Sequence, residues 1–479
     1  MLSYRFAKRH QIILSEHEGQ TTLFFVGTLN PLVLQEVQKH CLQPFALQQI
    51  DEQTLTKRLE QQYQGQDSNT DEAVRALSEE IDLAAFREQF AEAGDLLDSN
   101  DDAPIIKLIN AILADAIKQQ ASDIHIESFE HRIAVRIRVD GMLQTLMQPP
   151  VELAPFLVAR VKIMAGLDIA EKRLPQDGRI STQIAGRGVD IRVSTLPVAN
   201  AERVVMRILD KAASKFTLAD LALPEALQHS IRQIIHRPHG IFLVVGPTGS
   251  GKTTTLYASL SELDIAHKNI MTVEDPIEYF LDGISQTQVN SKAGMDFAKG
   301  LRAILRQDPD VIMVGEIRDL ETAEMAVQAS LTGHIVFSTL HTNTAIGAIM
   351  RLRDMGVEPF LVGSALSGVL SQRLVRKLCP HCKKTAADSE TAQHLLGGAA
   401  HYQAAGCEHC NQLGYRGRIG IYELIDIDET TREMIIDGKS EAVIKNYLQQ
   451  RCPSIIKHGL TLVKQGVTTL EEVMRVATL

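Results

Sequence analysis

The chain has 479 residues, of which 44% are hydrophobic, and its formal net charge of −10 corresponds to a pI near 5.9. This length predicts three or four domains with ordinary globular cores. The acidic balance argues against nucleic acid as the main partner, because phosphate backbones are bound by basic surfaces. No signal peptide is recognisable and no apolar run reaches the roughly 18–20 residues that span a bilayer, so a cytoplasmic protein is expected.

Residues 1–65 are predicted to form a small α/β domain. Short strands are expected over residues 12–14 and 23–27, with one helix from Pro31 and another over residues 54–63. No pattern in this domain carries catalytic chemistry, which favours a partner-binding role. Residues 66–99 are polar and acidic, and they predict a linker with one embedded helix over residues 72–90.

Residues 100–210 predict an α+β domain. Pro104 stands at a first helical position, and apolar residues follow it on one helical face. Alternating apolar residues over 132–139 predict a half-buried strand, which the hairpin turn Asp140-Gly141 ends. After a helix over 153–167, residues 178–181 and 189–194 predict a second hairpin. It carries Arg179 and Arg192, and spacing alone indicates only two exposed arginines on polar strand faces.

The next stretch is a strand, a glycine-rich turn and a helix, expected over residues 241–245, 246–251 and 252–263. The turn has the Gly-x4-Gly-Lys-Thr pattern of a phosphate-binding loop, in which backbone N–H groups and a helix N-terminus face the phosphates. We expect Lys252 to reach the β- and γ-phosphates of ATP or GTP, and the Thr253 hydroxyl to hold Mg²⁺. The predicted nucleotide-binding residues are Gly246, Pro247, Thr248, Gly249, Ser250, Gly251, Lys252, Thr253 and Thr254.

Residues 218–376 as a whole predict a mostly parallel sheet of the RecA type, since strands over 269–273, 311–314 and 335–339 alternate with helical patterns. Ligands bind at the strand ends of such sheets. Glu316 ends one apolar strand and is the expected general base. Gly315 occupies the position where common ATPases of this class place a first acid, so we expect Glu274 or Asp275 to act on Mg²⁺ or its water shell.

Two histidines, His334 and His341, bracket the strand over residues 335–339. A lone histidine is usually a structural residue, but two that flank a strand of the nucleotide sheet favour a γ-phosphate sensor or a role in subunit coupling. They are not expected to share a zinc ion, because seven residues of strand separate them by roughly 20 Å.

Residues 377–418 contain two CxxC pairs, which predict a zinc module in a chain without secretory signals. Two such pairs complete a tetrahedral thiolate site with no open position, so the role is structural. His381 and His409 are alternative ligands that a full cysteine set makes unnecessary. Residues 419–479 are expected to be mainly helical, with a capping box at Thr469. The predicted ligands are Cys379, Cys382, Cys407 and Cys410.

Four ordered motifs, over residues 246–253, 272–278, 315–319 and 332–343, resemble the Walker A, Asp box, Walker B and His box of secretion ATPases. That superfamily includes type II secretion, type IV pilus assembly and pilus retraction motors. The resemblance covers about residues 100–479, and its type II secretion branch is most similar over residues 123–127, 173–179 and 374–379. It implies a RecA-like P-loop core behind an α+β, PAS-like domain, with a zinc-binding insertion and a helical C-terminus.

The resemblance also implies a function and partners. It implies a homo-hexameric ring that uses ATP, Mg²⁺ and Zn²⁺ and drives pseudopilus assembly and the export of folded proteins. Arg179 and Arg192 match arginines that contact the phosphates when residues 100–210 close over the nucleotide. Residues 1–65 match the position of a domain that binds the cytoplasmic part of a bitopic inner-membrane protein. A polytopic platform protein receives the motion, so membrane association is indirect and peripheral to the inner membrane.

Three alternatives stay open at this point. A type IV pilus assembly motor uses the same chemistry for a different cargo. A nucleic-acid-stimulated ATPase of the RecA type is disfavoured by the acidic pI and the absence of Trp near the zinc knuckles. A scaffold that binds nucleotide without hydrolysing it is disfavoured by the presence of Lys252, Thr253 and Glu316.

Overall fold

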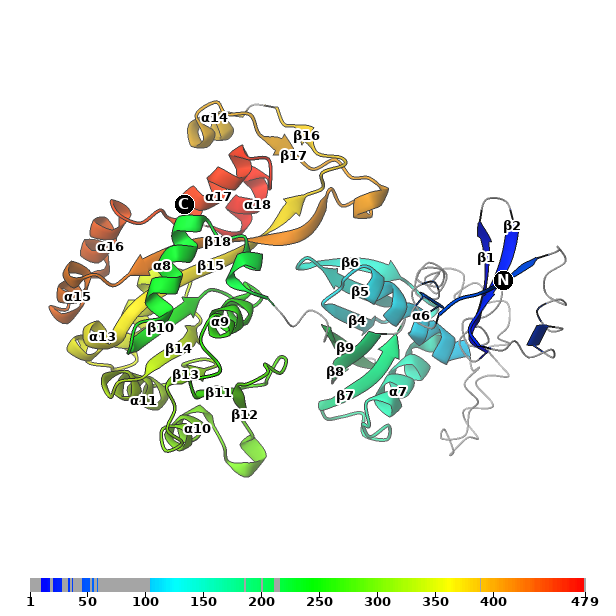
Figure 1. Ribbon diagram of the computed structural model, residues 1–479, viewed down its shortest axis with the longest axis horizontal. Helices are drawn as coiled ribbons and strands as arrows, with labels where there is room; N and C mark the ends of the chain where they lie inside the picture. The colour runs from blue at the N-terminus through cyan, green and yellow to red at the C-terminus, as the bar shows by residue number, and fades with distance from the viewer. Residues whose placement is uncertain are drawn as a thin grey trace. The chain divides into compact units, whose positions relative to one another are not determined.

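The computed structural model describes residues 104–184, 187–199, 201–210, 216–387 and 389–477, and nearer the N-terminus residues 10–17, 20–27, 33–34, 37, 45–51, 54–55 and 58. The chain folds as two compact units, Met1–Lys211 and Ala212–Leu479 (Figure 1). The predicted acidic linker and its helix lie outside the described residues. Among those that are described, no helix has the length and apolar character needed to cross a bilayer.

The N-terminal part of the first unit holds a three-stranded sheet. Both predicted strands are confirmed, and a third strand that the sequence analysis missed pairs in parallel with the second. Alternate residues of the first two strands face opposite sides, where Ile13 and Phe24 pack with Leu55 on one side. The helices expected from Pro31 and over residues 54–63 are described only at a few helical positions. The strands are β1 (Ile12–His17), β2 (Gln20–Phe25) and β3 (Ala46–Gln49).

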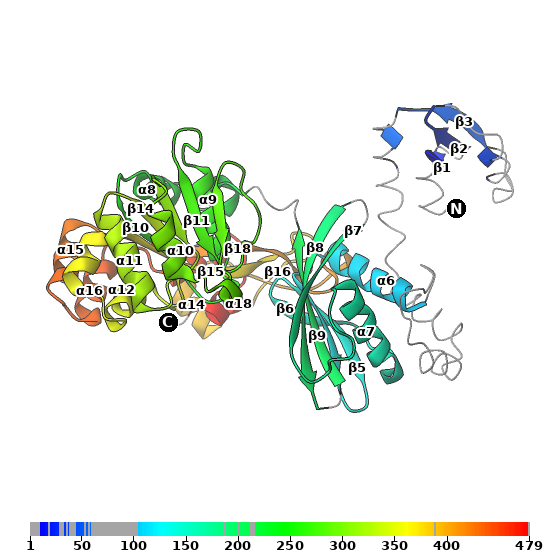
Figure 2. The ribbon, with the colours of Figure 1, turned by 90° about the horizontal axis from the view of Figure 1, so that it is seen from below.

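Residues 104–210 form a six-stranded antiparallel sheet with the order β6-β5-β4-β9-β8-β7. Two helices pack on one face, where alternate strand residues such as Ile133, Val135 and Ile137 are fully buried (Figure 2). The predicted helix start at Pro104 and the turn at Asp140-Gly141 are confirmed, whereas β9 was not expected. The elements are α6 (Pro104–Lys118), β4 (Asp123–Ser128), β5 (Ile133–Val139), β6 (Met142–Met147), α7 (Ala154–Met164), β7 (Gln176–Ile184), β8 (Arg187–Val198) and β9 (Ala201–Asp210).

The second unit is built on a seven-stranded sheet with the order β12-β11-β13-β14-β10-β15-β18. Every neighbouring pair is parallel except β15 with β18, so the prediction of a mostly parallel sheet is confirmed. Its elements up to residue 378 are α8 (Glu225–Ile235), β10 (Gly240–Val245), α9 (Lys252–Ser261), β11 (Ile270–Glu274), β12 (Ser285–Gln288), α10 (Phe297–Ile304), β13 (Val311–Val314), α11 (Leu320–Leu331), β14 (Ile335–Leu340), α12 (Ala345–Asp354), α13 (Pro359–Ala365) and β15 (Leu366–Leu378).

Helices cover both faces of this sheet, which explains why its central strands are continuously apolar. All six residues of β10 are buried. Ile241, Leu243 and Val245 contribute to a core that includes residues of α10, α11 and α12, whereas Phe242 and Val244 pack with residues of α8 and α9. The two cores hold β10 in place and thereby fix the loop at its carboxyl end.

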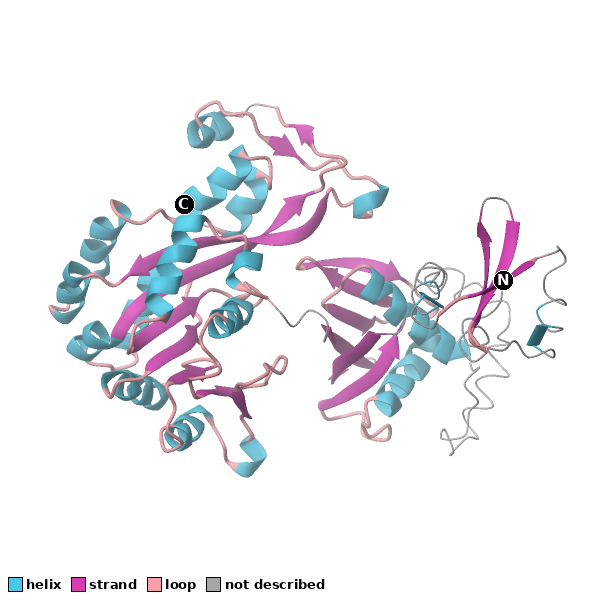
Figure 3. Cartoon of the chain, in the orientation of Figure 1, coloured by secondary structure: helices cyan, strands magenta, loops and turns pink. Residues whose placement is uncertain are grey.

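The strand pair β15 and β18 is longer than the rest of the sheet (Figure 3). β18 includes residues that the sequence analysis assigned to a mainly helical segment from residue 419, so that prediction missed the strand that completes the sheet. The capping residue Thr469 is confirmed, because its side chain accepts the backbone N–H of Glu472. The remaining elements are β16 (Lys384–Thr385), α14 (Glu390–Leu396), β17 (Tyr402–Gln403), β18 (Tyr415–Asp426), α15 (Glu429–Ile436), α16 (Glu441–Gln449), α17 (Ile455–Lys464) and α18 (Leu470–Val476).

Candidate functional site

The glycine-rich loop joins the carboxyl end of β10 to the start of α9, as the sequence predicts. Gly251 caps α9 with φ 85°, and a Cβ there would come within 2.8 Å of the Gln372 amide nitrogen. Gly246 is equally constrained, since a Cβ would meet the carbonyl of Gln372 at 2.5 Å. Only glycine fits these two positions, which bring the main chain of the loop against β15 and leave the N–H groups of the first helical turn for an outside acceptor.

The residues of the loop fit a bound phosphate chain. The Nζ of Lys252 donates hydrogen bonds to the carbonyls of Gly246 and Pro247, at 2.9 and 3.1 Å, so it lies across the loop. The hydroxyl of Ser250, 3% exposed, has no hydrogen-bond partner among the described residues. A helix N-terminus, a cation held by main-chain oxygens and an unpartnered buried hydroxyl together make a suitable environment for an anion.

The carboxylate of Glu316 faces this loop. It follows β13, and its main chain is tied to β14 because Ile317 donates to the carbonyl of Thr339. Burial lowers the pKa of Lys252, while the nearby negative charge of Glu316 acts in the opposite direction. The predicted general base therefore lies close enough to the phosphate-loop lysine to interact with it.

Glu316 is held by two side chains that do not come from its own strand. The Nε2 of His341, at the end of β14, lies 3.1 Å from one carboxylate oxygen, and Arg318 forms an ion pair with the other. The side chain of Glu316 is 13% exposed, against 52% for His341 and 60% for Arg318. The partners thus lie on the solvent side of the carboxylate, and His341 occupies the place expected of a residue that monitors the site. Arg318 was not singled out, although its position two residues after Glu316 could have indicated it.

The two acids that follow β11 differ in environment. Glu274 is 3% exposed, and its carboxylate accepts hydrogen bonds from Tyr257, Thr272 and Gln286. Burial raises the pKa of Tyr257, and the charge of Glu274 adds to this effect, so Tyr257 stays a donor. Asp275 is exposed. Because all of these contacts of Glu274 go to neighbouring side chains, Asp275 is the better candidate for an acid that reaches a metal or its water.

His334 lies at the other end of β14. It precedes Ile335, which pairs with Gly240 at the start of β10, whereas the phosphate loop follows the end of β10. Its Nδ1 lies 2.9 Å from the carbonyl of Ala329. The length of β14 thus separates His334 from Glu316 and His341, and the predicted pair of phosphate sensors reduces to His341. A role of His334 in subunit coupling stays a prediction.

The two predicted arginines lie on the first unit, in register with each other. Arg179 of β7 is opposite Arg192 of β8, so both project on the face that the helices leave open. A guanidinium nitrogen of Arg179 lies 2.5 Å from a carboxylate oxygen of Asp190, and its side chain is 61% exposed. Arg207 of β9 is opposite Arg192 and binds Asp123 at 3.1 Å. Arg207 was missed, although period-two alternation along β9 would have placed it on this charged face.

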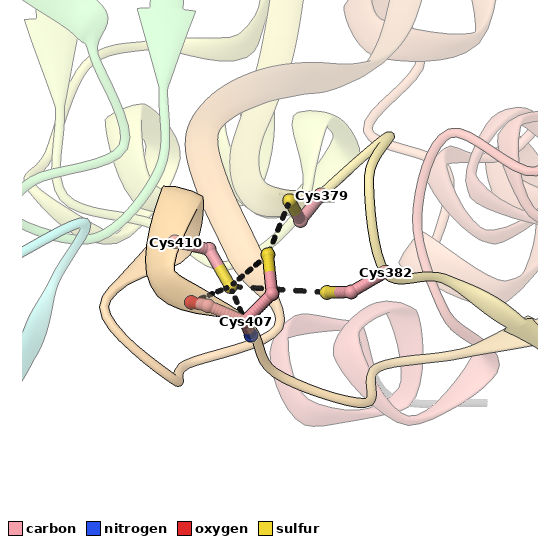
Figure 4. Close-up of side chains that lie close together, drawn as sticks. All are labelled: Cys379, Cys382, Cys407 and Cys410. Carbon is pink, nitrogen blue, oxygen red and sulfur yellow. Dashed lines mark hydrogen bonds between the residues drawn. The ribbon is translucent and has the colours of Figure 1, made fainter.

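The four predicted metal ligands converge at the end of the long strand pair (Figure 4). All four sulfur atoms lie within 4.8 Å of one another, and Cys379 and Cys410 are buried. Burial opposes ionisation of Cys410, but N–H donors from Cys407 and Gly414 outweigh it and lower the pKa of the thiol to about 7. His381 and His409 are exposed, with ring centroids 4.3 Å apart. Four converging thiols fit a closed tetrahedral metal site.

Comparison with known proteins extends over nearly the whole chain. The family described as Type II/IV secretion system protein matches residues 98–475, and a second family, an N-terminal domain of GSPII protein E, matches residues 1–63. The "Type II secretion system protein E" of Aeromonas hydrophila is 51% identical over 480 residues, covering 99% of this chain and 96% of the relative. The protein of the same name from Pseudomonas aeruginosa is 53% identical over 480 residues, with the same coverage.

Solved structures agree in fold. The pilus retraction motor PilT, crystallised with bound ADP, superposes with a TM-score of 0.54 at 30% identity and covers 77% of this chain and 97% of that chain. The Legionella pneumophila ATPase DotB gives a TM-score of 0.59 at 22% identity, covering 77% of this chain and 94% of that chain, and supports the fold alone.

Proposed function

Because the chain belongs to the type II/IV secretion system protein family and is an ATPase of type II secretion, we propose that it hydrolyses ATP to drive pseudopilus assembly and the export of folded proteins. The observation that carries this proposal is the identity of about half of all residues with proteins named for type II secretion, over both matched regions. The converging phosphate loop, Glu316 and His341 supply the chemistry that such a motor needs.

Each group of the second unit has a proposed role in hydrolysis. Residues 246–254 bind the phosphates, with Lys252 on the β- and γ-phosphates and the Thr253 hydroxyl toward Mg²⁺, and Asp275 is preferred over Glu274 for the metal's water shell. When bound, Mg²⁺ would neutralise charge that develops on the phosphate oxygens. Glu316 accepts the proton of the attacking water, and His341 and Arg318 fix the direction of its carboxylate.

The first unit is proposed to complete the site. Residues 100–210 would act as a PAS-like domain that closes over the nucleotide and brings Arg179 and Arg192 to the phosphates. The open charged face that carries both arginines supports this role. Closure repeated around a homo-hexameric ring would turn hydrolysis into motion, with residues 218–376 as the RecA-like half of each clamp.

The N-terminal domain is the proposed attachment to the secretion machinery. Its match to the N-terminal domain family of GSPII protein E supports binding of the cytoplasmic part of a bitopic inner-membrane protein, which places the ATPase at the inner membrane through a partner. A polytopic platform protein would then receive the motion. No direct contact with nucleic acid is expected, given the net charge of −10.

Zinc is the proposed occupant of the cysteine site, and protein purified without chelator is expected to contain about one Zn²⁺ per chain, because four thiolates satisfy a structural zinc ion. The variant Cys410→Ser removes one of the two buried ligands and is expected to lose the metal and unfold at a lower temperature. Elemental analysis and thermal unfolding measure both effects. Cys452→Ser is the matched control, since Cys452 lies outside the cluster. Absence of zinc from the unaltered protein would refute the assignment.

The secretion role is tested by complementation in the native host with Lys252→Ala, because loss of the lysine removes the cation that neutralises the phosphates. We expect export of secreted enzymes to stop while surface pili persist. Lys292→Ala, an exposed lysine of the same unit, is the control and should restore export fully. Loss of pili with intact export would instead favour the pilus assembly motor.

A further inference from the structure

One arginine of β15, Arg373, is buried beside the phosphate loop, and none of the roles above uses it. Its side chain is 8% exposed, and among the described residues it forms no ion pair. Burial lowers the pKa of Arg373, and the carboxylate of Glu423 opposes this only through a longer-range charge effect. A guanidinium without a close carboxylate is costly to bury, so its position requires another explanation.

The guanidinium of Arg373 connects two loops of the site. Its Nη1 donates to the carbonyl of Gln372 at 3.0 Å and lies 3.0 Å from where a Cβ on Gly246 would be. Its Nη2 donates to the carbonyl of Asn343 at 2.5 Å. One side chain thus joins the first residue of the phosphate loop to the segment that follows β14.

That segment carries His341. His341, with its ring on Glu316, lies two residues before Asn343, and Thr344 begins α12 by accepting the N–H of Gly347. Both His341 and Thr344 are exposed, so packing does little to fix the segment between β14 and the helix. The bond from Arg373 to the Asn343 carbonyl is therefore its internal anchor.

We infer that Arg373 is a positioning residue for ATP hydrolysis, which holds residues 341–344 so that His341 directs the carboxylate of Glu316. This inference rests on the proposed roles of His341 and Glu316. Arg373 also repels Lys252, since its charge contributes to the lowered pKa of that lysine, so the two cations lie close together. A bound phosphate chain relieves this repulsion, which explains how the fold tolerates a buried cation here.

The test compares Arg373→Gln with Arg376→Gln in steady-state ATP hydrolysis by the full chain. Both arginines lie on β15 and are largely buried, but Arg376 binds Glu472 of the C-terminal helix α18. We expect Arg373→Gln to lower kcat by about 10²-fold with KM for ATP unchanged, because a displaced catalytic group costs rate more than binding. Arg376→Gln should lower the unfolding temperature and leave kcat unchanged. Equal kcat losses in both variants, or a raised KM with normal kcat in Arg373→Gln, would overturn the inference.

Two further variants separate positioning from general damage. Arg373→Lys keeps a donor of positive charge and should recover part of the lost kcat. In a double-mutant cycle, Arg373→Gln added to His341→Gln should cause little further loss, since both act on Glu316 through one contact. Additive losses would contradict a path through His341. If Glu316→Gln retains turnover, the proposed function fails by itself; if it abolishes turnover while Arg373→Gln does not, only this inference fails.

Discussion

Glu316→Gln is expected to bind ATP at least as tightly as the unaltered protein while kcat falls by about 10²–10⁴-fold, the range for loss of a general base. The amide has nearly the shape of the carboxylate but cannot accept the proton of the attacking water. Binding is retained because the loss of the negative charge beside Lys252 makes the loop more attractive to phosphates. Nucleotide affinity and steady-state hydrolysis, measured on the same preparation, check both halves of this expectation.

The matched control is Glu324→Gln, the same chemical change at an exposed position of α11 in the same unit. It should leave both affinity and kcat unchanged. Hydrolysis by Glu316→Gln within tenfold of the unaltered rate would exclude Glu316 as the base and leave Asp275 and Glu278 as the acids to test.

Arg179→Ala and Arg192→Ala are each expected to lower kcat by roughly 10³–10⁵-fold, the effect of an arginine that stabilises charge on the transferred phosphoryl group. Affinity for ATP should change much less, since Lys252 and the loop N–H groups bind the phosphates without them. Single-turnover hydrolysis together with equilibrium nucleotide binding measures the two quantities separately.

Arg132→Ala is the control for this pair. Arg132 is an exposed arginine of the same unit that lies over the ring of Phe129, so its loss removes one positive charge without touching β7 or β8. Unchanged kcat in both Arg179→Ala and Arg192→Ala would remove these residues from the site. An equal fall in the Arg132→Ala control would show that net charge, and not position, is responsible.

The parts of the fold that depend on local sequence were predictable. The phosphate loop, the start of α6 at Pro104 and the cap of α18 at Thr469 each rest on residues within one turn of one another. By contrast, β18 is a strand because it pairs with β15, whose residues are about fifty positions earlier in the chain. A pairing over that distance leaves little signal in the segment itself, where glycines interrupt the apolar alternation.

The site was predictable as a set of motifs but not as a geometry. Sequence placed Glu274 and Asp275 together, and only the packing of Tyr257 and Gln286 against Glu274 distinguishes the buried acid from the exposed one. Likewise His334 and His341 bracket one strand, and the parallel register with β10 decides which of them meets the phosphate loop. Such distinctions depend on neighbours from other strands, which no local pattern encodes.

The long strand β15 has a mechanical consequence. Arg373 touches both catalytic loops, and the same strand runs on to Leu378, immediately before the first cysteine of the metal module. Six residues of extended chain span roughly 20 Å, and cross-strand pairing with β18 continues along this stretch. The cysteine module is thus joined to the catalytic loops by a bonded rod instead of a hinge. A load placed on the module reaches Arg373 along that rod, so the metal site serves as a handle at the far end of the catalytic machinery.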